Sequence, residues 1–441
     1  MDSTRTRSYL RVSSGLLLSF GLFFSYFLEP LGSLRLAIVA IGFAALTLEL
    51  LLWDVSLRRR LLVIASVGGY LLIAVGAIEL IAMRIDDRLF AVNAEHLVVV
   101  LPLFALLGWL IYRSGQGRLY IVVLLAVAAA VSVLAVAESV LDRSLVGRGY
   151  EFLTYQREGS ARALVGSENV LVLGATLAAM VPFSLKLRRL SLQILVTVIL
   201  VAGAWATGSR APALICTAVA AVQFFPFVRD LLQRFVWIVY AAAGLVVAGL
   251  AYLSLVVWTP FIAGATGLEY SSNYRGAIYS LVPEFLADRP LGYLLQQPPV
   301  GRWLVESQLH GDVDIARSID SEIVYAIFGL GWIGLALYLV AVFVSIAAIK
   351  RDVAIGLSSL MLTALGFILA LHGWDAMSPF WYALLGASTG ITLWPWVRPK
   401  VTRSNPYRPG DTTMSPSSGL TKAETLLAED PVLTRPTKEE L

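Results

Sequence analysis

The stretch Ser318-Ile319-Asp320-Ser321-Glu322 stands where a long polar segment gives way to an apolar helix, and the chain is organised around this boundary. The polar segment begins near Trp258 and is punctuated by arginine and proline, and the apolar helix continues past Gly334. Most of the remaining sequence consists of apolar runs. Because such runs serve mainly for packing, the long polar insertion is where we expect chemistry.

The composition is typical of a membrane protein. Of the 441 residues, 58% are hydrophobic and 15% are charged, whereas a soluble domain is about half apolar and about a quarter charged. A chain of this length accommodates about a dozen membrane spans of about twenty residues each. Its single cysteine, Cys216, lies within an apolar run and excludes an intrachain disulfide. We therefore expect an integral membrane protein.

Apolar runs bounded by charged residues predict an all-α, polytopic fold with about twelve transmembrane helices. A large extracytoplasmic loop, 259–318, separates the ninth and tenth spans and carries short amphipathic helices. We thus expect one transmembrane domain over 1–397, followed at 398–441 by a disordered cytoplasmic tail rich in Pro, Ser, Thr, Lys and Glu. The predicted spans are 10–28, 34–53, 61–83, 96–112, 119–140, 169–185, 190–207, 211–228, 235–257, 319–349, 353–371 and 379–397.

Positive charge in the short loops sets the expected orientation. One side of the membrane collects basic clusters around Arg5, Arg58, Lys186 and Lys350, and no lysine falls on the other side. This side is therefore expected to be cytoplasmic, with both termini inside. The alternation works with twelve spans, and it predicts a multi-pass protein of the cytoplasmic (inner) membrane.

Arg210 is an exception on the opposite side. It lies in the short loop Gly208-Ser209-Arg210-Ala211-Pro212 between two strongly apolar spans. One interpretation is an arginine that snorkels from a helix end to the membrane surface. The other is an outward-facing anion site, because the planar guanidinium group matches the geometry of phosphate.

The long loop contains an amphipathic helix over 274–286, which Asp288-Arg289-Pro290-Leu291-Gly292 ends. A helix of this kind is expected to lie at the outer membrane surface. Arg275 would then face either the lipid headgroups or a cavity. Both a headgroup-binding and a catalytic role stay open for it.

Asp320 precedes the tenth span. Aspartate and serine are good helix N-caps, and Glu322 in the first turn complements the helix dipole. Asp320 could equally be a carboxylate at the mouth of a cavity that takes a proton from a hydroxyl. A capping carboxylate can also face a cavity, so the two roles are compatible.

Other polar groups rank lower as site candidates. His310, Asp312 and Asp314 form a compact cluster, but Asp-x-Asp is short and frequent, so we interpret it as a solvated loop and expect no metal site. Glu79 and Glu138 lie near the outer ends of apolar spans, where the cost of a carboxylate falls. His372 and Asp375 in the last outward loop complete the second rank.

The motifs together resemble the O-antigen ligase and polymerase family, polytopic glycosyltransferases that use lipid-linked sugars. The resemblance covers about 160 to 340 and depends on the order, spacing and membrane side of short motifs. Ser167-Glu168-Asn169 is a looser match. The motifs are Thr207-Gly208-Ser209-Arg210-Ala211, Asn273-Tyr274-Arg275-Gly276-Ala277-Ile278-Tyr279, Asp288-Arg289-Pro290-Leu291-Gly292-Tyr293, Asp320-Ser321-Glu322-Ile323-Val324 and Gly331-Trp332-Ile333-Gly334.

The chain departs from the family at its closing motif. Asp320 stands where ligases that transfer sugars to the lipid A core carry histidine, and Ser321 replaces asparagine. An acidic residue at this position is more similar to the polysaccharide polymerases of the family. The resemblance therefore favours a polymerase, with a ligase that transfers the finished glycan to a lipid or other acceptor as the alternative.

The resemblance implies a GT-C-like fold and an inverting, metal-independent transfer from a polyprenyl-pyrophosphate-linked glycan to a glycan acceptor, without a cofactor. The departing pyrophosphate needs fixed cations, for which Arg210 and Arg275 are the candidates. A sugar hydroxyl benefits from a general base, and Asp320 is our candidate. Reserve roles in substrate binding fall to Arg162, Arg289, His310 and Glu322.

The resemblance also implies partners, namely the lipid bilayer, a flippase and a chain-length regulator, and no nucleic acid. A different class, a flippase or transporter of lipid-linked glycans, would also have many spans. It predicts internal repeats and charges near the bilayer midplane. This chain shows no convincing repeat and concentrates its charges at the outer rim, which favours chemistry at the outer face over transport or a scaffold.

Overall fold

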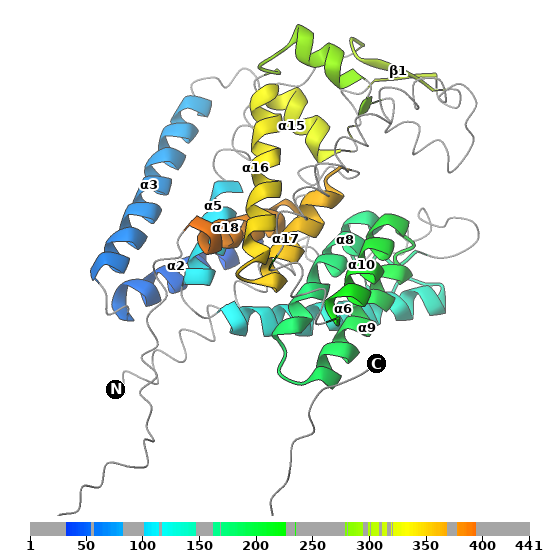
Figure 1. Ribbon diagram of the computed structural model, residues 1–441. Coiled ribbons are helices and arrows are strands. Elements are labelled where there is room, and N and C mark those ends of the chain that lie inside the picture. The colour runs from blue at the N-terminus through cyan, green and yellow to red at the C-terminus, as the bar shows by residue number, and fades with distance from the viewer. Residues whose placement is uncertain are drawn as a thin grey trace, which may run out of the picture. The chain divides into compact units, whose positions relative to one another are not determined.

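A computed structural model of the chain, shown in Figure 1, describes residues within the unit Met1–Pro395. The predicted first span, the predicted ninth span and the tail 398–441 lie outside the described residues. The described residues are 32–53, 57–82, 101–113, 117–146, 162–167, 169–225, 234, 278–279, 281–293, 299, 301–307, 311–314, 319, 321–367 and 377–393.

The N-terminal half of the described chain is helical where apolar runs predict spans. Helix α2 covers Gly32–Trp53, α3 covers Leu57–Ala82, α5 covers Leu101–Arg113 and α6 covers Gly117–Leu141. Buried leucines of α2 and α5, with Phe104 of α5, form a small apolar core. These helices confirm the helical prediction for their segments.

The next segment forms a group of short apolar helices. Helix α8 covers Val170–Met180 and continues into the 3-10 helix η4, Val181–Lys186, which has a proline at its start. Helix α9 then covers Leu190–Ala206, and α10 covers Arg210–Gln223. Together with α6, these helices form one part of the main apolar core, which continues into the helices after residue 322.

The predicted tenth span, 319–349, is wrong as one continuous helix. The chain forms α15, Glu322–Leu330, and α16, Trp332–Ile349, separated by Gly331 with φ 61° and ψ −134°. This conformation is essentially restricted to glycine. The two helices then pack against each other, and α17 (Val353–Leu365) and α18 (Met377–Leu393) follow.

The predicted loop contains a structure that the apolar pattern did not indicate. Strand β1, Leu304–Ser307, pairs antiparallel with β2, Gly311–Asp314, with Leu304 opposite Asp314. The backbone N–H of Gly301 donates to Oδ2 of Asp314 at 2.7 Å. Asp314 therefore stabilises the hairpin, and the segment of Asp312 and Asp314, predicted as a solvated loop, is a strand.

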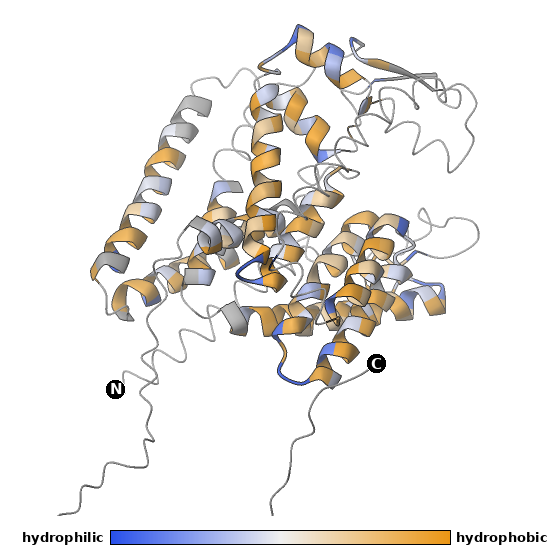
Figure 2. Cartoon of the chain, in the orientation of Figure 1, coloured by the Kyte–Doolittle hydropathy of each residue, from blue (hydrophilic) through white to orange (hydrophobic). Residues whose placement is uncertain are grey.

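Two described helices, Leu119–Leu141 and Trp332–Ile349, are long and apolar enough to cross a membrane. Shorter apolar stretches of 10–17 residues lie in other described helices, among them Ala40–Leu52 within α2 and Arg60–Gly76 within α3. Hydrophobic residues predominate along the helices, as Figure 2 shows, and many large apolar side chains are exposed, with Leu72 78% exposed. Exposed apolar surface of this kind indicates membrane association. The number of spans and the side of the termini stay predictions.

Candidate functional site

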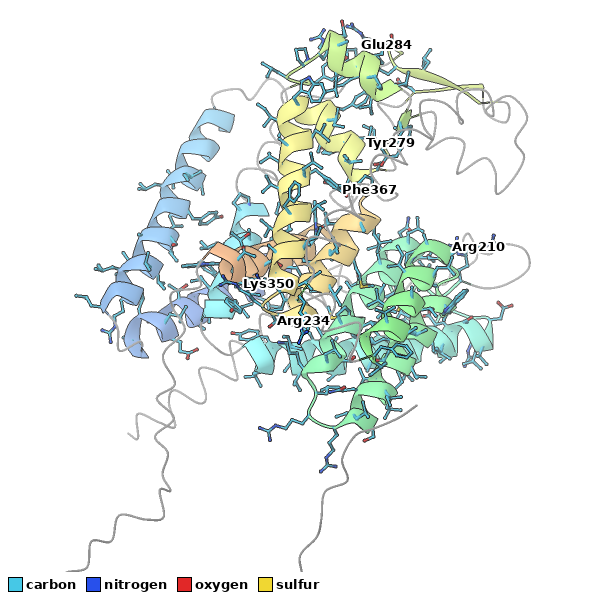
Figure 3. All side chains as sticks on the ribbon, in the orientation of Figure 1. Arg210, Arg234, Tyr279, Glu284, Lys350 and Phe367 are labelled. Atoms are coloured by element: carbon cyan, nitrogen blue, oxygen red, sulfur yellow. The ribbon has the colours of Figure 1, made fainter. Side chains whose placement is uncertain are left out.

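The turn between α9 and α10 presents Arg210 as the first residue of α10, with an exposed side chain (Figure 3). Hydrogen bonds within the turn stabilise it. The hydroxyl of Thr207 donates to the carbonyl of Ala204 at 2.7 Å and accepts from the N–H of Ser209 at 3.2 Å. Gly208 has φ +65°, a left-handed conformation that glycine adopts without steric cost. The predicted Ser-Arg turn is thus a rigid feature.

Arg162 lies directly on this turn. Its Nε donates to the carbonyl of Thr207 at 3.2 Å, and its Nη2 donates to the carbonyl of Gly208 at 3.3 Å and to Oγ of Ser209 at 3.5 Å. A Cβ atom at Gly208 would lie 2.9 Å from Nε of Arg162, so the absence of a side chain there lets the arginine approach. The structure therefore brings Arg162 to the turn that carries Arg210.

Glu138 organises the backbone on which Arg162 sits. Its side chain is fully buried near the end of α6, and its two carboxylate oxygens accept four backbone N–H groups. Oε1 accepts from Leu145 at 2.9 Å and Val146 at 3.1 Å, and Oε2 accepts from Leu164 at 3.0 Å and Val165 at 2.8 Å. We ranked Glu138 low from the sequence. Its signal was a carboxylate within an apolar run.

A strained turn follows Arg162. The N–H of Ser167 donates to the carbonyl of Leu164 at 2.8 Å, and the two central residues, Val165 and Gly166, have φ of 48° and 72°. A positive φ is unusual for a β-branched residue. The looser motif at 167–169 then begins α8, because Oδ1 of Asn169 accepts from the N–H of Leu171 at 2.8 Å as the N-cap.

Two further motifs meet at a hydrogen-bonded tyrosine. The hydroxyl of Tyr279, at the end of the Arg275 motif, lies 2.8 Å from Oγ of Ser321 and donates to the carbonyl of Phe367 at 2.6 Å. Figure 3 shows Tyr279 beside Phe367. Ser321 occupies the N-cap position of α15 but makes no side-chain capping bond, so its hydroxyl serves this contact instead. The N-cap position of α15 is therefore occupied by Ser321.

The segment 288–293 docks onto the break between α15 and α16. The N–H of Tyr293 donates to the carbonyl of Phe328 at 2.9 Å, and the N–H of Trp332 donates to the carbonyl of Pro290 at 3.0 Å. At this contact Gly292 and Gly331 both have positive φ, and a Cβ on either would clash with the backbone of the other segment. Two motifs of the sequence thus form one backbone joint.

An aromatic cluster reinforces this joint. Phe285 is fully buried and stacks on Phe328 with ring centroids 4.0 Å apart, and Trp303 meets both rings edge-on. Arg289 lies over the ring of Tyr293 at 5.1 Å. Its Nε is 3.6 Å from a carboxylate oxygen of Asp288, which also pairs with Arg302 at 2.7 Å. Arg289 is thus exposed on the surface of the docked loop.

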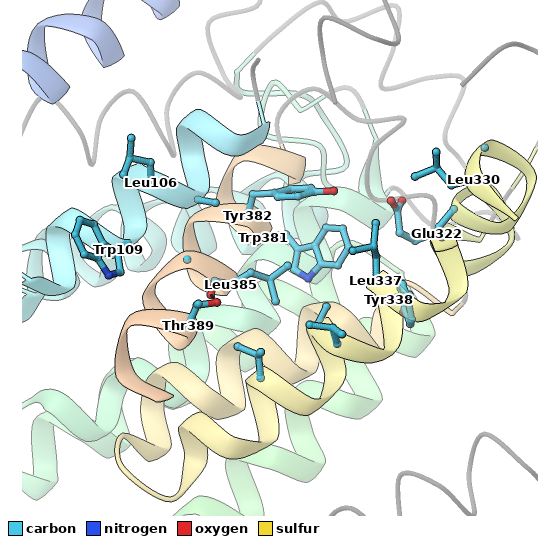
Figure 4. A pocket seen from close by; sticks show the side chains of 18 of the residues that line it. Leu106, Trp109, Glu322, Leu330, Leu337, Tyr338, Trp381, Tyr382, Leu385 and Thr389 are labelled. Atoms are coloured by element: carbon cyan, nitrogen blue, oxygen red, sulfur yellow. Dashed lines mark hydrogen bonds between the residues drawn. The ribbon is translucent and has the colours of Figure 1, made fainter. Parts of the chain in front are cut away.

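Glu322 is buried at the first turn of α15, where it was predicted. It lines a cavity of about 500 Å³ bounded by α5, α15, α16 and α18, which Figure 4 shows from close by. Its backbone N–H donates to the carbonyl of Gly366 at 2.7 Å. The remaining lining is mostly apolar and includes Trp381 and Tyr382. The cavity therefore combines one carboxylate with an apolar wall.

Arg275, His310 and Asp320 lie outside the described residues, as do Glu168, His372 and Asp375. Their roles stay predictions. Among the described residues, no group of three or more His, Cys, Asp or Glu side chains is placed to hold a metal ion. No family model, no curated protein and no solved structure matches the chain.

Proposed function

We propose that this chain is a membrane glycosyltransferase that polymerises polyprenyl-pyrophosphate-linked oligosaccharides at the outer face of the cytoplasmic membrane. The contact between Tyr279 and Ser321 is the observation that carries the proposal most strongly. Arg275 lies four residues before Tyr279, and Asp320 immediately precedes Ser321. The contact thus joins the segment with a candidate cation to the segment with a candidate base.

The charge of the leaving group explains why the proposed site needs arginines. When the glycosyl bond breaks, its electron pair goes to the pyrophosphate oxygen, and fixed cations stabilise this charge. Nε and Nη2 of Arg162 donate to carbonyls of the turn that carries Arg210, so a second positive charge lies at the same turn. Arginine suits this role because its fork of N–H donors matches phosphate oxygens in pairs.

The proton of the acceptor hydroxyl explains why the proposed site needs a carboxylate. Its oxygen forms the new bond to the anomeric carbon on the face opposite the departing pyrophosphate, which inverts the configuration. Its proton passes to Asp320, and a base in this position typically contributes about 10² to 10⁴ in rate. The backbone joint between Pro290 and Trp332 supports a fixed loop against which two long glycans could be held.

Three substitutions test the proposal in cells. Arg210→Ala, Arg275→Ala and Asp320→Ala, each present at normal protein levels, should abolish long surface glycan while short lipid-linked units accumulate. Arg188→Ala, an exposed arginine on the predicted cytoplasmic side, is the matched control and should leave chain length unchanged. Unchanged chain length in all three variants would contradict the proposal. Long polymer that stays on its lipid carrier would favour the ligase.

A further inference from the structure

Glu138 holds both ends of the segment that joins α6 to α8. The amides of residues 145–146 and of residues 164–165 donate to the same carboxylate. We propose that Glu138 is a positioning residue, whose carboxylate fixes the backbone carrying Arg162 and so sets the geometry of an anion site with Arg210. The inference rests on the proposed function, in which the anion is the departing pyrophosphate.

The connection from the carboxylate to the anion site is short. Glu138 binds the amides of Leu164 and Val165, two and three residues after Arg162. Between them, the N–H of Ala163 donates to the carbonyl of Ala206 at 3.1 Å. The guanidinium of Arg162 then reaches the carbonyls of the next two residues, 207 and 208. Residues 162–165 are continuous backbone, held at one end by Glu138 and at the other by the turn, so a shift of the 164–165 backbone moves the arginine.

The strained turn shows why a strong acceptor is needed here. Val165 has φ 48° although valine disfavours this region, and such conformations persist only where the surroundings over-determine them. Its N–H makes the shortest of the four bonds to Glu138, at 2.8 Å. The carboxylate thus stabilises a backbone conformation that the local sequence does not favour.

The chemistry of the side chain makes the role specific. All four groups that face the carboxylate are donors, and a carboxylate offers two acceptor oxygens with about four lone-pair sites. Glutamine has nearly the same shape, but its amide nitrogen is itself a donor and would face two N–H groups. Glu138→Gln therefore leaves two of the four amides, at residues 145–146 or 164–165, without an acceptor. Glu138→Asp keeps both acceptor oxygens on a stem that is shorter by one methylene.

Isothermal titration of the purified full-length protein with inorganic pyrophosphate tests the role. The dissociation constant and the stoichiometry are obtained separately, and a merely structural loss of folded protein lowers the stoichiometry alone. For Glu138→Gln we expect the dissociation constant to rise about tenfold or more, since orphaned buried amides move to recover a partner. Glu138→Asp should raise it less. Glu49→Gln, which removes an equally buried carboxylate from α2, should leave it unchanged.

Hydrogen–deuterium exchange of the same proteins provides a second readout that does not require a ligand. In Glu138→Gln, faster exchange should extend from the amides of residues 145–146 and 164–165 to the turn 207–210. Faster exchange confined to the first two segments, with an unchanged dissociation constant, would overturn the inference and leave the proposed function standing. Failure of the unaltered protein to bind pyrophosphate would overturn the anion site. The inference about Glu138 and the proposed function would then both be wrong. Weaker pyrophosphate binding without any change in glycan extension would support the inference and contradict the proposed function.

Discussion

The hydroxyl of Tyr279 lies 2.8 Å from the hydroxyl of Ser321, and the two residues are 42 positions apart in the chain. The same tyrosine donates to the backbone carbonyl of Phe367, and the N–H of Glu322 donates to the carbonyl of Gly366. Three segments therefore meet at the start of α15. Two of them carry the motifs on which the predicted chemistry depends.

Tyr279→Phe should remove this connection while preserving the ring. We expect a loss of about 1 kcal/mol in the free energy of unfolding, the usual contribution of a hydrogen bond, and a clear fall in transfer activity. Thermal unfolding in detergent and the length of glycan products measure the two effects. Tyr120→Phe is the control, because this buried tyrosine of α6 belongs to the small apolar core and lies outside the motifs. Equal activity losses in both variants would argue against a special role for the contact.

Gly331→Ala should disrupt the joint between the loop and helices α15 and α16. Alanine would have to adopt φ 61° and ψ −134°, and its Cβ would clash with the backbone of Pro290. The expected cost is about 3 kcal/mol, which thermal unfolding would report. Gly68→Ala in α3, where a Cβ meets nothing within 4 Å, should be nearly neutral. A stable Gly331→Ala protein would mean that the break between α15 and α16 is misplaced.

Phe285→Ala should release the loop from α15. The side chain is fully buried and stacks on Phe328, so its removal should lower the free energy of unfolding by about 3 to 5 kcal/mol. This loss weakens the docking of the loop. Limited proteolysis should then cleave the segment after residue 288 faster than in the unaltered protein. Phe285→Leu, which keeps most of the apolar volume, should protect the segment better. Identical cleavage of all three proteins would exclude docking through this ring.

Asp352 forms an ion pair and caps a helix, and different substitutions can separate these two roles. Its carboxylate pairs with Lys186 at 2.6 Å and accepts from the N–H of Ile355 at 3.3 Å as the N-cap of α17. Asp352→Ala loses both interactions and should cost about 1 to 2 kcal/mol, whereas Asp352→Asn keeps a capping oxygen and should cost less. Thermal unfolding compares them. A larger loss for asparagine than for alanine would contradict the capping role.

The sequence predicted the helical segments well but not the break at Gly331. Apolar residues continue on both sides of this glycine, and hydropathy does not report backbone torsion angles. The hairpin of β1 and β2 was missed for a related reason, since each strand has only four residues and is too short for a long alternating pattern. The segment was therefore expected to contain only short helices.

For the candidate site, the order of the motifs predicted which residues lie close together. It did not predict the hydrogen bonds that hold them in place. Arg162 was named as a reserve cation, and it lies on the turn of Arg210. Glu138 was ranked low because a single sequence shows a carboxylate in an apolar run without showing its donors. Those donors are backbone amides up to 27 residues away, and they leave no trace in residue type. The convergence of Arg275 and Asp320 on this site stays a prediction.

Extension of a purified lipid-linked substrate tests the central claim most directly. The protein is reconstituted in vesicles with a polyprenyl-pyrophosphate-linked oligosaccharide and a chelator of divalent metals, and the products are separated by size. We predict a ladder that grows by whole repeat units, with inverted configuration at each new bond, and no ladder for Arg210→Ala or Asp320→Ala. An unaltered substrate, or extension that appears only after a divalent metal is restored, would contradict the account.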